Sequence, residues 1–415
     1  MQVGEDFAPV VQSGDIFQTG VMDCPSLHGE RYTVVEEGVK YRLPQPNFTL
    51  SGLTAGETLF TLQDGRIAAL QFSLYNRGDD GTLDDAAYLE KLKSCVSALC
   101  ALTGQKQTPC NRKSNPSVST YDIGGFLWKG PACQWLLEYS VVTKGTKTVP
   151  SPEYIRLKAL PPNAQLAPKA SGAGNRVRVN PRKNVVKAPD GSCEIQNIPM
   201  VDQGAKGYCA AATTARVMAY YGYEELDQHQ IAMWAQTDAE GGTSSEAMMK
   251  GISRVLHDKY KLNVRELEPA FDGKDVKKLL DRYNKAARRD GLVEIPFPPP
   301  ITNLNQLFAL FNADALRKAR VPTPQYPAQW LQQKIKPSID AGIPVLWSVQ
   351  LGIVPEAGLP QAGGGHMRLI IGYGPGGKTL LYSDSWGAGH EKKSMPIEDA
   401  ITITLGLKAI SPTLN

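Results

Sequence analysis

The chain has 415 residues, of which 45 are Lys or Arg and 41 are Asp or Glu, so its formal net charge is +4. Hydrophobic residues make up 42% and charged residues 21%, which is ordinary for a globular protein and argues against intrinsic disorder. The length predicts two or three domains. The charge is too small to favour a nucleic-acid partner, and prolines interrupt the longest uncharged stretch (295–313), so we expect no membrane span.

Seven cysteines are unevenly distributed along the chain. Four of them lie between Cys95 and Cys133, and none has the paired spacing of a zinc site. Disulfide bonds in a secreted or periplasmic protein would explain this crowding, whereas buried free cysteines in a cytoplasmic protein are the alternative. The first ten residues lack an apolar signal-peptide core, so a secreted protein would already have lost its signal peptide. We favour the secreted or cell-envelope location.

The first 160 residues predict an extended lead-in (1–45) and a small α+β domain (46–160). Asp64-Gly65 between two apolar runs is a strong hairpin signal, and a helix is expected from Asp84 or Asp85 to Gly104. The expected strands are 59–62, 67–74, 126–128, 133–142 and 154–160. This pattern predicts an antiparallel sheet with one long helix. It carries no histidine after His28, and we see no catalytic constellation in it.

A basic segment follows at 161–192. It is rich in Pro, Gly and Ala, and its first 29 residues contain six Lys or Arg and no acidic residue. We interpret it as a solvated interdomain linker and a place for proteolytic nicking, in preference to a nucleic-acid-binding arm.

Residues 193–415 predict a second, larger domain. Helical patterns come first and strands afterwards, which indicates an α+β domain with a helical layer and an antiparallel sheet. The expected helices are 209–221, 245–259, 273–289, 304–319 and 328–341, and the expected strands are 344–350, 366–373, 379–384 and 400–405.

Cys209 is the first candidate for chemistry. It lies where a glycine-containing turn meets a predicted helix, and a thiol at a helix N-terminus has a lowered pKa. Gln203, six residues earlier, could place its amide beside the thiol and form an oxyanion hole with the Cys209 backbone N–H. The alternative is a buried structural cysteine that begins a core helix.

His366 and Asp384 are the second candidates. They border two apolar runs joined by the turn Gly374 to Gly377, so a hairpin would bring them opposite one another within two or three residues. A carboxylate in that place can orient an imidazole and stabilise its charged form. The other histidines have no such partner, although His390 lies close in sequence. Nothing supplies a fourth metal ligand, so we expect no metal and no cofactor.

These residues lie in motifs that resemble the papain-like cysteine peptidases, closest to the branch of double-glycine leader peptidases. The matching motifs are DQG at 202–204, YCAA at 208–211, RVMAYYG at 216–222, GH at 365–366, IIGYG at 370–374 and SDSWG at 383–387. The resemblance covers about residues 195–405. It departs at Ala210, where family members usually carry Gly, and Asp384 stands where papain has Asn.

The resemblance implies a Cys-His-Asp triad of Cys209, His366 and Asp384, with Gln203 as oxyanion donor and Trp386 shielding the His–Asp hydrogen bond. The function expected is peptide-bond hydrolysis through an acyl-enzyme, with a peptide or protein as substrate. Acyl transfer of the transglutaminase type and a non-catalytic binding protein on a peptidase-like fold are the alternatives. Loops at 236–245, 291–303 and 352–365 are expected to form the cleft walls. The domain at 46–160 is either an inhibitory pro-region or a targeting or substrate-binding module.

Overall fold

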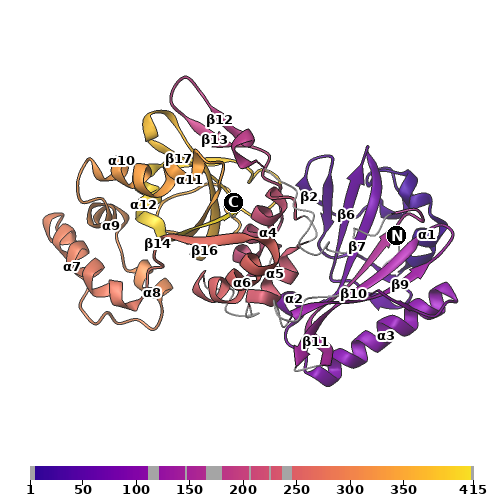
Figure 1. Ribbon diagram of the computed structural model, residues 1–415. Helices are drawn as coiled ribbons and strands as arrows, with labels where there is room; N and C mark the ends of the chain where they lie inside the picture. The colour runs from indigo at the N-terminus through magenta and orange to yellow at the C-terminus, as the bar shows by residue number, and fades with distance from the viewer. Residues whose placement is uncertain are drawn as a thin grey trace.

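The computed structural model describes residues 5–110, 121–144, 147–164, 180–204, 207–223, 226–235 and 245–412. Figure 1 shows two β-sheets, one in each half of the chain, with helices around them. Every strand pairing described within the two large sheets is antiparallel. The predicted α+β class is therefore confirmed.

The N-terminal half contains an eight-stranded sheet in the order β2-β3-β6-β7-β11-β10-β9-β8. Its strands are β2 Thr33–Glu36, β3 Lys40–Leu43, β6 Glu57–Gln63, β7 Arg66–Asn76, β8 Thr108–Pro109, β9 Tyr121–Lys129, β10 Gln134–Lys144 and β11 Lys147–Leu160. A smaller sheet consists of β1 Glu5–Asp6, β4 Phe48–Leu50 and β5 Leu53–Thr54. The helical segments are α1 Ala8–Ser13, η1 Asp15–Gln18, η2 Pro25–Leu27, α2 Arg77–Asp80 and α3 Asp85–Thr103.

Local sequence signals explain the hairpin and the long helix of this half. The β6–β7 hairpin turns at Asp64-Gly65, and both residues have positive φ, as a tight hairpin turn requires. Helix α3 begins at Asp84, whose side chain accepts a hydrogen bond from the Ala87 N–H, and it ends at Gly104 in the left-handed conformation. Its buried positions are Tyr88, Leu92, Cys95 and Leu99, spaced to face one side.

The region expected as an extended lead-in contributes strands to the large sheet. β2 and β3 form a hairpin, and β3 then pairs with β6. These short strands escaped the sequence analysis because their burial is mostly intermediate, so the alternation of apolar and polar residues is weak.

The C-terminal half contains a second sheet in the order β12-β13-β16-β15-β19-β14, with β17 pairing to β16 and β18 to β17. Its strands are β12 Val185–Lys187, β13 Cys193–Ile195, β14 Leu262–Glu268, β15 Val345–Leu351, β16 Gly364–Tyr373, β17 Thr379–Ser383, β18 Lys393–Pro396 and β19 Thr404–Pro412. The helical segments are η3 Pro181–Asn184, α4 Cys209–Tyr220, α5 Gln228–Ala235, α6 Ser245–Tyr260, α7 Gly273–Arg289, α8 Leu304–Ala309, α9 Ala313–Arg320, α10 Tyr326–Trp330, η4 Leu331–Ile335 (a π-helical turn), α11 Lys336–Ile339, η5 Pro375–Gly377 and α12 Ile397–Ile403.

Two elements differ from the sequence-based expectation. The single helix predicted at 304–319 is two helices, α8 and α9, because Asn312 caps a new helix by accepting from the Asp314 and Ala315 N–H groups. The strand predicted at 400–405 is mostly the last turn of α12, and β19 begins only at Thr404. A short apolar run is compatible with a buried helix as well as with a strand, so the hydrophobic pattern of 400–405 could not distinguish the two.

Parts of the predicted linker, 161–192, belong to regular structure. Residues 181–187 form η3 and β12, and β12 pairs with β13. Residues 165–179, with the basic side chains Lys169, Arg176 and Arg178, lie outside the described residues. The proposed domain limits of 46–160 and 193–415 stay predictions.

All seven cysteines are free, so the structure shows none of the expected disulfides. Cys24, Cys95, Cys133 and Cys193 are buried. Burial raises the pKa of Cys95 and of Cys133 to about 11, so both are neutral thiols within a core. Among the described helices, none is long and apolar enough to cross a bilayer.

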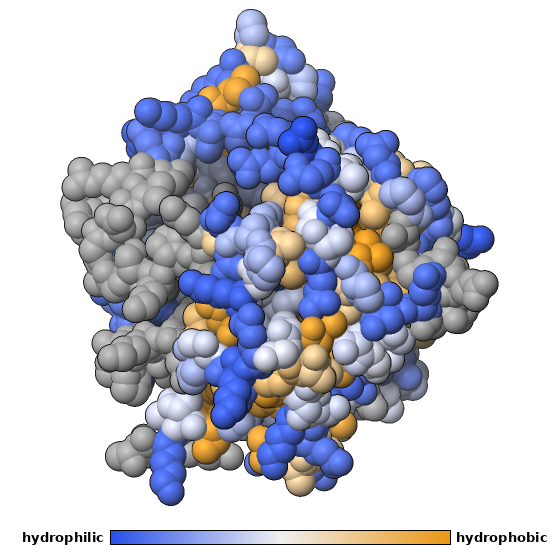
Figure 2. Space-filling view, turned by 90° about the vertical axis from the view of Figure 1, so that its right-hand side faces the viewer, coloured by the Kyte–Doolittle hydropathy of each residue, from blue (hydrophilic) through white to orange (hydrophobic). Residues whose placement is uncertain are grey.

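The surface of the N-terminal half is mixed. Figure 2 looks onto this end of the molecule and shows hydrophobic residues in small groups among hydrophilic ones. Scattered groups of this kind are normal for a protein surface.

Candidate active site

Cys209 is the first residue of α4, as the sequence predicted. The helix is twelve residues long and ten of them are buried, so it runs through the core of the C-terminal half. Thr213 on α4 donates a side-chain hydrogen bond of 3.2 Å to the carbonyl of Met367 on β16. This bond fixes the helix that begins at Cys209 against the strand that carries His366, one residue away. The Cys209 thiol therefore lies at the positive end of a helix and beside β16.

His366 and Asp384 come together through the β16–β17 hairpin. Leu369 pairs with Ser383 and Ile370 with Tyr382, which places Asp384 just beyond the last paired residue of β17. His366 Nε2 lies 3.1 Å from Asp384 Oδ1, and both side chains are fully buried. The hairpin thus brings together the two residues that the sequence analysis paired.

Trp386 covers the imidazole. Its ring stacks on the His366 ring with 4.2 Å between centroids and 7° between planes. Because both rings are flat against each other, the indole blocks one face of the imidazole from water. His390 packs edge-on against Trp386, and its carbonyl accepts from the Asp384 N–H at 3.0 Å. The one other histidine that the sequence analysis singled out therefore supports the loop through its backbone.

The charges of the site favour a thiolate–imidazolium pair. Burial by itself raises the pKa of Cys209, but the nearby His366 and its positive charge lower it below the ordinary thiol value. Burial also lowers the pKa of His366, but the hydrogen bond to Asp384 and the nearby Cys209 thiol more than reverse this, so the pKa of His366 is raised. Both shifts widen the pH range in which Cys209 is negative and His366 positive.

Two buried arginines hold Asp384, and the sequence analysis missed both. Arg368 Nε donates to Asp384 Oδ1 at 3.0 Å, and Arg216 Nη1 donates to the Asp384 carbonyl at 2.8 Å. Burial raises the pKa of Asp384, whereas His366, Arg368 and Lys393 together hold it below its usual value. Arg368 stands two residues after His366 on the same strand, hence on the same face. A charged residue inside an otherwise apolar strand was the signal that could have revealed it.

Gln203 lies in the turn before α4 and is buried. Its backbone N–H donates to the Ser385 carbonyl at 2.8 Å, and its side-chain oxygen accepts from Ser385 Oγ at 2.7 Å. This pair of bonds ties the turn before Cys209 to the residue between Asp384 and Trp386. Because Ser385 Oγ donates to the side-chain oxygen of Gln203, the orientation of the Gln203 carboxamide is also fixed.

One of the loops expected to line a cleft, 352–365, meets helix α8 near His366, just after the second expected loop, 291–303. A Cβ at Gly364 would lie 3.7 Å from the Asn305 side chain, so α8 approaches β16 two residues before His366. Gln361 donates to the Gly363 carbonyl at 2.7 Å and shapes the loop before the strand. The third loop, 236–245, lies outside the described residues except for Ser245.

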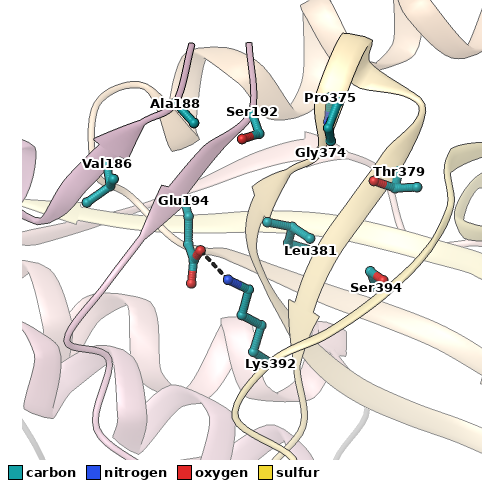
Figure 3. A pocket seen from close by; sticks show the side chains of 10 residues that line it. All are labelled: Val186, Ala188, Ser192, Glu194, Gly374, Pro375, Thr379, Leu381, Lys392 and Ser394. Carbon is teal, nitrogen blue, oxygen red and sulfur yellow. Dashed lines mark hydrogen bonds and ion pairs between the residues drawn. The ribbon is translucent and has the colours of Figure 1, made fainter. Parts of the chain in front are cut away.

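Among the described residues, the other clusters of polar side chains carry no comparable chemistry. Within the part of the chain that the structure describes, no group of three or more His, Cys, Asp or Glu could hold a metal ion. A pocket of about 360 Å³ opens between the β12–β13 hairpin and β17, where Glu194 forms an ion pair with Lys392 (Figure 3). The residues that line it include no Cys, His or Asp, so we assign it no catalytic role.

Comparison with known proteins gives a partial match. Residues 301–402 match the "Peptidase_C39 like family". This span includes His366 and Asp384 but not Gln203 or Cys209. No curated protein matches the chain. Among solved structures, xylellain, a cysteine protease from Xylella fastidiosa, is 15% identical, with 52% of this chain and 83% of that chain covered. The TM-score of this match is 0.28.

Proposed function

We propose that the chain hydrolyses peptide bonds with a triad of Cys209, His366 and Asp384, and the match of residues 301–402 to the "Peptidase_C39 like family" supports this proposal. The observation that carries this proposal is the position of the His366 ring. One ring nitrogen faces the Asp384 carboxylate, the ring interacts with the Cys209 thiol, and Trp386 covers one face. An imidazole placed between a carboxylate and a thiol is the arrangement that activates a cysteine nucleophile.

The reaction begins with attack of the Cys209 thiolate on the carbonyl carbon of the substrate. The carbonyl oxygen becomes negative, and the Gln203 amide and the Cys209 backbone N–H donate hydrogen bonds to it. The C–N bond then breaks while His366 gives its proton to the leaving amine, and a thioester remains on Cys209.

Water completes the cycle. His366, now neutral, takes a proton from a water molecule that attacks the thioester carbonyl. The thioester bond breaks, the carboxylic acid leaves and the thiolate–imidazolium pair is restored. Asp384 stays ionised throughout and keeps the ring oriented. The substrate is a peptide or protein, and the residues around the site that we describe do not define its sequence.

Alkylation with iodoacetamide at pH 6 tests the nucleophile. We expect Cys209 to be alkylated faster than any cysteine of the urea-denatured chain, because only a thiolate reacts. Cys95 and Cys133 are internal controls, since their pKa of about 11 keeps them protonated at this pH. His366→Ala should remove the advantage of Cys209. Alkylation of Cys209 no faster than in the denatured chain would refute the proposal.

Product analysis tests the reaction. The full chain is incubated with a mixed peptide library, with and without an added primary amine, and compared with Cys209→Ala. We expect new peptide N-termini that Cys209→Ala does not produce. If the amine were instead incorporated into the products at the expense of hydrolysis, acyl transfer would replace hydrolysis as the activity.

A further inference from the structure

The N-terminal half contacts the C-terminal half at three places close to the proposed triad. Each contact is made by a residue that is one or two positions in sequence from Gln203, Cys209 or Trp386. The contacted segments, 202–204, 207–208 and 385–390, are loops or turns, so what they pack against fixes their position.

The first contact is an ion pair between the halves. Arg42 on β3 lies 3.2 Å from Asp202, and Glu57 holds the same guanidinium at 2.8 Å. All three side chains are at most 13% exposed, so water screens the pair only weakly. The other oxygen of Asp202 accepts from the Gly204 N–H at 2.8 Å. The Asp202 carboxylate therefore links the N-terminal sheet to both sides of Gln203.

The second contact involves the residue before the nucleophile. Tyr208 is buried, and a hydrogen bond links its hydroxyl to the backbone of Gly78 in α2. A Cβ at Gly78 would lie 2.5 Å from the Tyr208 ring, so only glycine allows this approach. The ring also packs edge-on against His229 at 5.6 Å. The start of α4 is thus held from the N-terminal side.

The third contact involves the loop that carries Trp386. The Val34 carbonyl on β2 accepts from the Ala388 N–H at 3.0 Å. A Cβ at Gly387 would lie 3.1 Å from the same carbonyl oxygen, which again indicates close backbone approach. Strand β2 therefore supports the loop two residues after Trp386.

From these three contacts we propose that the N-terminal half is a permanent part of the active site and that Arg42 is a positioning residue for the oxyanion donor Gln203. This inference rests on the proposed function. It replaces the idea of a removable inhibitory pro-region. Within the described residues the three contacts go to neighbours of Gln203, Cys209 and Trp386. They support the site and do not involve the Cys209 thiol or the His366 imidazole. Removing the half would leave Asp202 without its buried cation.

Two matched Asp→Asn variants separate positioning from general stabilisation. Asp202→Asn breaks the pair with Arg42, whereas Asp227→Asn breaks a second ion pair between the halves, with Arg156. In both cases the asparagine can keep the backbone hydrogen bond, to Gly204 in one and to Gln230 in the other. Only Asp202 adjoins a proposed site residue. The two variants therefore make the same chemical change, Asp to Asn in an ion pair between the halves, at two different positions.

We expect Asp202→Asn to lower kcat for peptide hydrolysis about tenfold with KM within about twofold, because a displaced oxyanion donor weakens only the transition state. Asp227→Asn should keep the wild-type kcat. Alkylation of Cys209 should stay at the wild-type rate in both, since it needs no oxyanion hole. Arg42→Gln should match Asp202→Asn, the double variant should lose no more than either one, and Arg42→Lys should recover part of the loss.

Equal losses in the two Asp→Asn variants, or additive losses in the double variant, would overturn the inference. Thermal unfolding of each variant identifies any loss of kcat that comes from misfolding. If Arg42→Gln misfolds, Arg42→Lys replaces it in the test, because lysine keeps the positive charge beside Asp202. Failure of the proposed function looks different: the wild type itself would show neither Cys209-dependent hydrolysis nor fast alkylation.

Discussion

Glu153 offers a quantitative test of how the two halves meet. It lies on β11, 3.3 Å from Arg77 of α2, and its side chain is 15% exposed. Burial raises the pKa of Glu153 to about 7 although Arg77 acts in the opposite direction. The negative charge of Glu153 also raises the pKa of Tyr208, after the larger effect of burial, so the carboxyl group lies close to the residue before Cys209.

The test is the substitution Glu153→Gln, which removes the ionisable group. One unit of pKa corresponds to about 1.4 kcal/mol, so a rise from 4.5 to about 7 means that ionised Glu153 destabilises the folded state by about 3 kcal/mol. Below pH 4.5 the group is protonated in both states and the penalty is absent. The penalty grows as the pH rises from 4.5 to about 7 and is constant above that. Glutamine never ionises and therefore avoids it.

Urea unfolding followed by circular dichroism at pH 5 and at pH 8.5 measures the effect. We expect Glu153→Gln and the wild type to differ little at pH 5, and the variant to be more stable by about 3 kcal/mol at pH 8.5. Glu90→Gln, at an exposed position of α3, controls for the loss of one charge and should show no such change. If the difference between Glu153→Gln and the wild type were the same at both pH values, the burial argument would be refuted.

Three further predictions concern the site. Asp384→Asn removes the charge that raises the pKa of His366, so the alkaline limb of the pH–kcat profile should move to lower pH; a stopped assay from pH 5 to 9 measures it, and an unmoved limb would contradict the assignment. Trp386→Ala should lower kcat about tenfold by admitting water to the His366–Asp384 hydrogen bond, whereas Trp386→Phe should retain most of it. Gln203→Ala should lower kcat about 10²-fold with little change in KM, and a loss confined to KM would argue against an oxyanion role.

Strong local signals made much of the fold predictable. α3 has a capping Asp84 and a terminal Gly104, and α7 has a capping box at Asp272, so both helices begin and end close to where the sequence indicates. The hairpin at Gly374 to Gly377 fixed the approach of His366 and Asp384 because a short turn allows few registers.

The supporting arginines could not be predicted in the same way. Arg216 lies on α4 and reaches the carbonyl of Asp384, 168 positions later in the chain. Arg42 reaches Asp202 across 160 positions. No local pattern encodes such partners, because the contact depends on how whole elements pack and not on the residues beside each arginine.

The site is assembled from distant parts of the chain, and this has a consequence for its synthesis. Cys209 on α4 and His366 on β16 are separated by 157 positions. At a ribosomal rate of about 5–20 residues per second, this interval lasts on the order of 10–30 s. During that time Cys209 has been made but His366, the imidazole proposed to activate it, has not. Strand β3 and helix α2, which contact Asp202 and Tyr208, have already been made. Until synthesis has passed β16, the nascent chain therefore carries Cys209 without the general base of the proposed hydrolysis.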